Sequence, residues 1–288
     1  MQWIKSIPEM RSIAAKWRLA GEKIALVPTM GYFHRGHLAL MEKARRENER
    51  TVVSLFVNPT QFGPGEDYDR YPRNPEQDGR AAEKIGVDAV FNPEPVEMYP
   101  PGYQTHVEVS RLSQGLCGAQ RPGHFRGVAT VVTKLFNIVQ PDRAYFGEKD
   151  AQQLRVIKRM VFDLNLPVEI KAVPTVREED GLALSSRNTY LSSAERRQAT
   201  VLFRSLFYAE KQVKRGETDT SFLAESMRRL ISQYPLVELE YVEFRDDETL
   251  EPVREIKGKV LIALAARVGK TRLIDNVTIQ RPKKEGTE

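Results

Sequence analysis

Residues 23–37 read KIALVPTMGYFHRGH, and this stretch decides the fold. Lys23–Thr29 is an apolar run typical of a buried strand, and the residues from His37 to about Arg46 have the pattern of a helix. Gly31 and Gly36 lie in the turn between them, where glycine lets the backbone approach a ligand closely. A helix that begins there offers unpaired N–H groups to a phosphate. The stretch therefore predicts an α/β unit with an anion-binding turn.

The same alternation of strands and helices continues along the chain after this unit. Further strands are predicted at 51–57, 89–91, 143–146 and 168–173, and helices at 75–85, 128–139 and 151–164. Strands that alternate with helices indicate a parallel sheet with right-handed crossovers. We therefore expect a Rossmann-like, doubly wound α/β domain over residues 1–176.

The pattern changes after Asn188. Ser192 with Glu195 three residues later is a capping-box signature, and it predicts a helix that runs to about Arg215. A helix at 220–233 and strands at 238–244 and 259–266 follow. We expect a smaller α+β domain over residues 177–288, with a charged tail at 281–288 that frays.

Composition excludes several classes of protein. The 288 residues contain one cysteine, Cys117, so neither an intrachain disulfide nor a multi-cysteine zinc site is possible. The N-terminus lacks the apolar core of a signal peptide, and the run 260–266 is far shorter than the roughly 20 residues that cross a bilayer. We expect a cytoplasmic protein without a membrane partner. The net charge of +5 arises from interspersed 44 basic and 39 acidic residues, so nucleic acid is not the expected partner.

Two of the four histidines, His34 and His37, stand three residues apart in the turn that opens the first helix. This spacing places both rings on one face of the first helical turn. Imidazoles there can donate hydrogen bonds to phosphate oxygens, and these bonds strengthen as charge builds up during a reaction. Half of a metal site and simple helix capping are the two alternatives, and the context of strand, glycine turn and helix favours the phosphate role.

Seven blocks of sequence, in order, resemble the motifs of one enzyme family. They are VPTMG (27–31) with HRGH (34–37), FVNPTQF (56–62), YPR (71–73), RPGHFRG (121–127), FGEKD (146–150) with QQ (152–153), DGLALSSRN (180–188) and RLIDN (272–276). The HRGH stretch resembles the signature of the class I aminoacyl-tRNA synthetase and nucleotidyltransferase superfamily. All the blocks together resemble the pantoate–β-alanine ligase (pantothenate synthetase) family. Phe33 and Leu184 depart from the family pattern, each by one apolar residue for another.

The resemblance implies a two-step reaction. The carboxylate of (R)-pantoate attacks the α-phosphorus of Mg-ATP, which gives pantoyl adenylate and pyrophosphate. The amine of β-alanine then attacks the acyl carbon, which releases pantothenate and AMP. The family is generally dimeric, so the resemblance also implies a homodimer.

The resemblance further implies that residues 1–176 form the catalytic domain that binds nucleotide and pantoate, and that residues 177–288 contribute the loop of Ser185, Ser186 and Arg187. It also implies which residues form the site. It assigns catalysis to His37, as a proton donor, together with His34 and Lys149, pantoate binding to Gln61 and Gln153, and β-alanine binding to Gln61. The residues implied to bind ATP are Met30, Gly31, Tyr32, Phe33, His34, Arg35, Gly36, His37, Gly147, Glu148, Lys149, Asp150, Val176, Leu184, Ser185, Ser186 and Arg187.

The chemistry of these residues agrees with those roles. The Lys149 ammonium can lie on phosphate oxygens, and the Asp150 carboxylate is an oxygen donor of the kind that Mg²⁺ prefers. The amide of a glutamine can both donate to and accept from a hydroxy acid. Pro28, Met30, Phe62 and Val132 are expected to form the apolar wall around the gem-dimethyl group.

Two other functions remain possible at this point. A nucleotidyltransferase would leave the nucleotide on its product, whereas the ligase releases AMP. A basic protein that binds nucleic acid would show salt-dependent binding and no turnover of small molecules. Only the net charge favours the second alternative.

Overall fold

The computed structural model describes residues 1–280, in which the chain forms two compact units, Met1–Val176 and a second that begins at Arg177. The predicted frayed tail, 281–288, lies outside the described residues. None of the helices within residues 1–280 is both long and apolar enough to cross a membrane.

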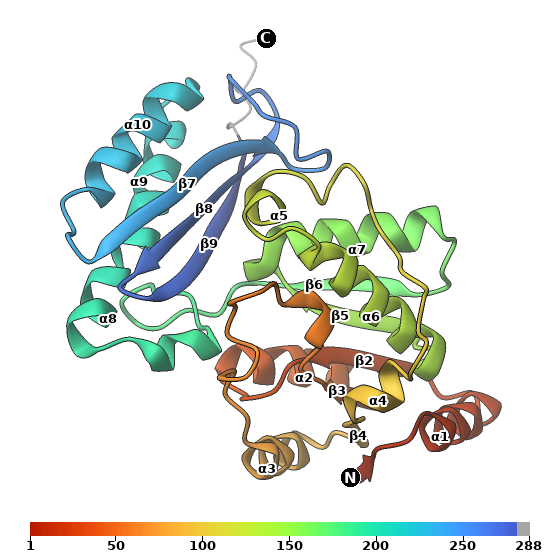
Figure 1. Cartoon of the computed structure of the whole chain (residues 1–288). Helices are drawn as coiled ribbons and strands as arrows, with labels where there is room; N and C mark the ends of the chain where they lie inside the picture. The colour runs from red at the N-terminus through yellow and green to blue at the C-terminus, as the bar shows by residue number, and fades with distance from the viewer. Residues whose placement is uncertain (281–288) are drawn as a thin grey trace. The chain divides into compact units, whose positions relative to one another are not determined.

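The first unit contains a six-stranded sheet in which every paired strand is parallel, in the order β1-β4-β3-β2-β5-β6 (Figure 1). Its strands are β1 (Gln2–Ile4), β2 (Ile24–Thr29), β3 (Arg50–Leu55), β4 (Ala89–Phe91), β5 (Arg143–Gly147) and β6 (Glu169–Val173). Its longer helices are α1 (Ile7–Leu19), α2 (Arg35–Glu47), α3 (Pro75–Ile85), α6 (His124–Val139) and α7 (Ala151–Asp163). Short helical segments are η1 (Pro59–Gln61), α4 (Pro95–Met98), α5 (Leu116–Gln120) and η2 (Glu148–Asp150). The prediction of a doubly wound parallel sheet is confirmed.

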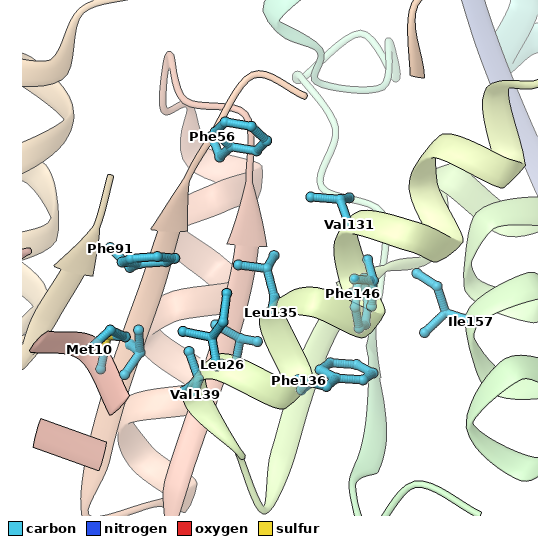
Figure 2. Packing of buried hydrophobic residues seen from close by; sticks show 14 of the residues in the cluster. Met10, Leu26, Phe56, Phe91, Val131, Leu135, Phe136, Val139, Phe146 and Ile157 are labelled. Carbon is cyan, nitrogen blue, oxygen red and sulfur yellow. The ribbon is translucent and has the colours of Figure 1, made fainter. Parts of the chain in front are cut away.

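Helices cover both faces of the sheet. Successive side chains of a strand point to opposite sides, so each strand buries side chains on both faces. On one face, Leu26 of β2 belongs to a cluster with Met10 of α1, Leu135 of α6 and Ile157 of α7 (Figure 2). On the other face, side chains of α2 and α3 pack against alternate strand residues such as Val27. Both faces of β2 are therefore apolar, which explains the uninterrupted apolar run in its sequence.

The sequence interpretation missed the first strand and the first helix. β1 has only three residues, and it is held by parallel pairing with β4, more than 80 positions further along the chain. Such a short strand has no periodicity from which it could be recognised. α1 does have a local signal, since Ser6 caps it by accepting from the Glu9 N–H and a proline occupies its first turn.

The second unit combines helices with a three-stranded antiparallel sheet in the order β7-β8-β9. Its elements are η3 (Ser186–Tyr190), α8 (Ser193–Ala199), α9 (Val201–Lys214), α10 (Thr220–Ile231), β7 (Val237–Asp246), β8 (Lys259–Val268) and β9 (Thr271–Gln280). The prediction of a smaller α+β part is confirmed, and so is the capping box of Ser192 and Glu195.

Two details of the second unit differ from the prediction. The single helix expected from Ser192 to Arg215 is broken at Thr200, which ends α8 and begins α9. The Thr200 hydroxyl donates to the Arg197 carbonyl, so it competes for a backbone acceptor at the break. The third strand, β9, was not assigned, because its alternation is interrupted by polar residues on both faces.

Candidate active site

Three neighbouring strands end at the same edge of the sheet, and the segment after each contains candidate residues. β2 lies between β3 and β5, and all three are parallel (Figure 1). Met30–His37 follow β2, Phe56–Phe62 follow β3, and Glu148–Asp150 follow β5. Ligands of doubly wound sheets bind at this carboxyl edge, where the strand order reverses direction. The fold thus gathers the first-unit candidates at one edge.

Asp78 of α3 holds the turn that follows β2. Its carboxylate accepts from the Tyr32 N–H (2.8 Å) and from the Phe33 N–H (2.7 Å), and the residue is only 2% exposed. Gly31 has φ +88°, and a Cβ there would lie 2.6 Å from Leu55 Cδ1. Only glycine fits this close approach. Sequence reasoning missed Asp78, because an acidic residue in the first turn of a helix is common at the surface.

The two histidines form the start of α2 and accept hydrogen bonds from its backbone. His34 Nδ1 accepts from the Gly36 N–H (3.1 Å), and His37 Nδ1 accepts from the His34 N–H (3.3 Å). A backbone N–H can only donate, so each Nδ1 is unprotonated and each neutral ring carries its proton on Nε2. The ring centroids are 4.1 Å apart. Capping and the phosphate role are therefore compatible, because capping uses Nδ1 and leaves Nε2–H as a donor.

Burial and positive charge keep these rings neutral. Loss of solvent, followed by the nearby Lys149 ammonium, lowers the pKa of His34 from 6.5 to about 4. Loss of solvent, then His34 and Lys149, lowers the pKa of His37 well below its ordinary value. The Lys149 charge contributes to the lowered pKa of both rings, and Asp150 Oδ1 lies 3.9 Å from Lys149 Nζ. Two neutral donors therefore open α2, and a cation follows the neighbouring strand β5.

These lowered pKa values predict how stability depends on pH. Between pH 4 and 6.5 the unfolded chain binds more protons at His34 than the folded chain, so the free energy of unfolding should decrease as pH falls through this window. We expect His34→Gln to reduce this loss of stability, measured as thermal midpoints from pH 7 to pH 4. His106→Gln, at an exposed histidine, is the control and should match the wild type. Identical pH profiles for all three proteins would contradict the prediction.

Gln61 lies in η1, directly after β3, and it is buried. Its Nε2 lies 3.0 Å from Met30 Sδ. The structure therefore brings this predicted pantoate residue next to residues 30–37, which we call the histidine turn. Gly127 of α6 packs against η1 so closely that a Cβ would lie 2.4 Å from the Thr60 carbonyl oxygen. The close contact of α6 and η1 therefore requires glycine at 127.

The adjacent glutamines of α7 have different environments. Gln152 is buried, accepts from the Cys117 N–H (3.0 Å) and donates to the Leu112 carbonyl (3.0 Å), so it attaches α5 and the segment before it to α7. Gln153 is half-buried and lies in the first turn of α7, just after Lys149 and Asp150. Of the two, Gln153 is the one whose amide is not used in this attachment, which agrees with the predicted pantoate role.

A cluster that sequence reasoning left without a role contacts the backbone of Gln61. His124 Nδ1 lies 2.8 Å from the Gln61 carbonyl oxygen, and Arg121 donates to the same oxygen (3.3 Å). Arg121 also pairs with Glu66 in the loop after η1. Burial and the neighbouring Arg121 lower the pKa of His124 to about 4, so a neutral Nδ1–H donates to the carbonyl. The RPGHFRG block is the sequence signal that contained these residues.

The remaining candidates lie in or next to the second unit. Val176 is the last residue of the first unit, and Leu184 to Arg187 belong to the second. Ser185 Oγ accepts from the Arg187 N–H (3.3 Å), and Ser186 is buried. Arg177 anchors this loop, because it donates to the Gly181 carbonyl (3.1 Å) and to both oxygens of Asp275. The approach of Ser185–Arg187 to the histidines and Lys149 stays a prediction.

Asp150 was the one residue predicted to hold a metal. Residues 1–280 contain no group of three or more histidine, cysteine, aspartate or glutamate side chains arranged to hold a metal ion. A single half-exposed carboxylate next to a lysine fits Mg²⁺ that arrives with a nucleotide, because this ion keeps several waters and uses one or two carboxylates besides phosphate oxygens.

Comparison with known proteins identifies the family. The family model described as pantoate–β-alanine ligase matches residues 2–278. The pantothenate synthetase of Thermosipho melanesiensis is 56% identical over 279 residues, which cover 97% of this chain and 99% of that protein. The crystal structure of pantothenate synthetase from Thermus thermophilus is 48% identical, with a TM-score of 0.92, and the match covers 96% of this chain and 99% of that one.

A third relative was crystallised with ligands. It is the pantoate–β-alanine ligase of Francisella tularensis, described as complexed with "Beta-gamma ATP" and β-alanine, at 35% identity, a TM-score of 0.80 and coverage of 96% of this chain and 97% of that one. Fold, motifs and matches together define this protein as a ligase. The chain belongs to the pantoate–β-alanine ligase family, so the resemblance seen in its motifs is confirmed.

Proposed function

We propose that this ligase uses ATP to activate (R)-pantoate as pantoyl adenylate and then transfers the pantoyl group to β-alanine. The observation that supports the proposal is the placement of His34, His37 and Lys149 at one edge of the sheet: the two histidines open α2 after β2 with Nε2–H as donor, and Lys149 follows β5, the neighbouring parallel strand. The ligands named in the Francisella tularensis structure support the use of ATP and β-alanine.

In the first step, a carboxylate oxygen of pantoate forms a bond to the α-phosphorus, and the bond from that phosphorus to the bridging oxygen breaks. Pyrophosphate leaves with the negative charge, so the site needs donors and positive charge at its oxygens. Lys149 supplies the charge. The neutral rings of His34 and His37 supply Nε2–H donors, and they add no further positive charge next to Lys149.

Gln61 and Gln153 would bind pantoate at the same edge of the sheet, with Gln61 also next to β-alanine. Asp150 would hold Mg²⁺ together with the nucleotide, and the ion would neutralise phosphate charge. In the second step, the β-alanine nitrogen bonds to the acyl carbon while the bond to the AMP oxygen breaks. AMP leaves with the electron pair, and the nitrogen loses a proton to give the amide of pantothenate.

Isotope exchange tests this sequence of steps. With ATP, Mg²⁺ and pantoate but no β-alanine, we expect labelled pyrophosphate to enter ATP, because adenylate formation is reversible. Addition of β-alanine should then release AMP in equal amount to pantothenate. Absence of exchange, or a product that retains the nucleotide, would overturn the adenylate pathway, and the second result would favour a nucleotidyltransferase. A related acid that lacks the hydroxyls serves as the control.

We also propose that the enzyme is a cytoplasmic homodimer. Membership of a family that is generally dimeric supports the homodimer, and a sequence with a single cysteine, which fits a reducing compartment, supports the cytoplasm. Light scattering at micromolar concentration would give the mass, and a monomer of 32.9 kDa would contradict the dimer.

A further inference from the structure

The side-chain amide of Asn58 has an orientation fixed by two backbone groups. Asn58 is 1% exposed and precedes η1. Its Oδ1 lies 3.3 Å from the Thr60 nitrogen, which can only donate, and its Nδ2 lies 3.1 Å from the Gly127 carbonyl oxygen, which can only accept. Exchanging the oxygen and nitrogen of this amide would place donor against donor and acceptor against acceptor. The amide of Asn58 therefore has one orientation.

The orientation of Asn58 determines that of Gln61. The NH₂ group of Asn58 also donates to Gln61 Oε1, at 3.2 Å. The Gln61 oxygen must face Asn58, so the Gln61 NH₂ group faces the other way, where it lies 3.0 Å from Met30 Sδ. A thioether is a weak acceptor, so this NH₂ group can exchange it for a better one. Gln61 thus presents a donor to the site next to the histidine turn.

Tyr99, just after α4, completes this chain of contacts. Its hydroxyl donates to Asn58 Oδ1 (2.9 Å) and lies 3.3 Å from the Thr60 hydroxyl. The centroid of the Tyr99 ring lies 6.3 Å from that of Phe56 and 5.0 Å from that of Tyr103, and both rings restrict its position. Burial raises the pKa of Tyr99 to about 12, so the phenol remains a donor at neutral pH.

We propose that Tyr99 is a positioning residue for the substrate acid. The two backbone groups decide which way round the Asn58 amide faces, and the Tyr99 hydroxyl fixes where this amide lies, so that the Gln61 NH₂ group stays directed toward the substrate. The group that Gln61 recognises is then an acceptor, either a carboxylate oxygen or a hydroxyl oxygen of a hydroxy acid. This assignment rests on the proposed function, because it takes Gln61 to contact pantoate.

The test compares Tyr99→Phe with Tyr103→Phe. Tyr103 contacts the Tyr99 ring, and the structure gives its hydroxyl no hydrogen bond within residues 1–280, so it is a matched control. Tyr99→Phe should raise the KM for pantoate about three- to tenfold, the range expected for one net hydrogen bond, and leave the KM for ATP and kcat within about twofold. Tyr103→Phe should change none of them.

A double-mutant cycle separates positioning from a general structural effect. In a Gln61→Ala background, Tyr99→Phe should no longer change the KM for pantoate, because the amide on which it acts is gone. An unchanged KM for pantoate in Tyr99→Phe would overturn the assignment. Equal rises in the KM for ATP, an equal effect of Tyr103→Phe, or a persisting effect without Gln61 would also overturn it. The proposed function is tested separately, by exchange of labelled pyrophosphate into ATP with the wild-type enzyme. If the wild type shows no such exchange, the assignment of Tyr99 is overturned as well.

Discussion

Lys149→Ala is expected to lower the single-turnover rate of adenylate formation by about 100- to 1000-fold, the range found when a preorganised donor to a developing negative charge is removed. The ammonium acts on both histidine rings, and neutral imidazoles cannot replace its charge. His37→Ala should cause a loss of similar size, because it removes one Nε2–H donor. Rapid-quench measurement of pyrophosphate release gives the rate.

Lys158→Ala, at an exposed lysine on α7, is the control and should retain the wild-type rate. Lys149→Ala has a second readout that does not depend on turnover. Since the ammonium lowers the pKa of His34, its removal should raise that pKa, which a titration followed by NMR would detect. A rate less than tenfold below wild type, about 1.4 kcal/mol of barrier, would refute the role of Lys149.

Arg177→Leu is expected to destabilise the second unit by about 3 kcal/mol, the lower end of the range for removing one partner of a buried ion pair, because the Arg177 side chain is itself 22% exposed. Asp275 is 3% exposed, and its two oxygens accept from the two terminal nitrogens of Arg177 at 2.6 and 2.8 Å. Without Arg177 the carboxylate would remain buried without that charge. Urea unfolding followed by circular dichroism would measure the loss.

Arg196→Leu is the matched control for this experiment. Arg196 also binds both oxygens of an aspartate, Asp180, at 2.8 and 3.0 Å, but this pair is exposed. Exposed pairs contribute about 0–1 kcal/mol, so the control should change stability little. Equal losses in the two variants would show that burial does not increase the contribution of the Arg177 pair to the free energy of unfolding.

Arg177 also anchors the loop of Ser185–Arg187, which the proposed function assigns to ATP binding. A folded Arg177→Leu protein should therefore bind ATP less tightly.

The parts of the fold that sequence predicts are those with a local cause. The apolar run of β2, the glycines of the turn and the capping box of α8 each specify structure within a few residues. The alternation of strands and helices also predicts a parallel sheet, and all strands of a parallel sheet end at the same edge. The carboxyl ends of β2, β3 and β5 could therefore be predicted to lie along one edge. Gln61 and Lys149 were assigned to one site by the resemblance of their motifs to the family, and the shared edge of the sheet agrees with that prediction.

Contacts between distant parts of the chain could not be predicted from the sequence. Tyr32 and Asp78 are 46 positions apart, and Asn58 and Tyr99 are 41 apart. No periodicity or motif spacing indicates that an aspartate of α3 supports the histidine turn, or that a tyrosine after α4 acts on the residue before η1. The attachment of α5 and the segment before it by Gln152 is likewise a contact between distant residues, 35 and 40 positions apart, that the sequence does not indicate.

The two hydrogen bonds from Tyr32 and Phe33 to Asp78 have a consequence for affinity. They hold the backbone after Gly31 in one conformation through contacts that belong to the protein itself. A segment that is already ordered loses little conformational entropy when a ligand arrives, at a saving of about 1–2 kcal/mol for each residue that would otherwise have to be fixed. In the proposed reaction, binding energy gained at this turn would therefore be free to bring the triphosphate toward its reactive geometry instead of being consumed in ordering the protein around it.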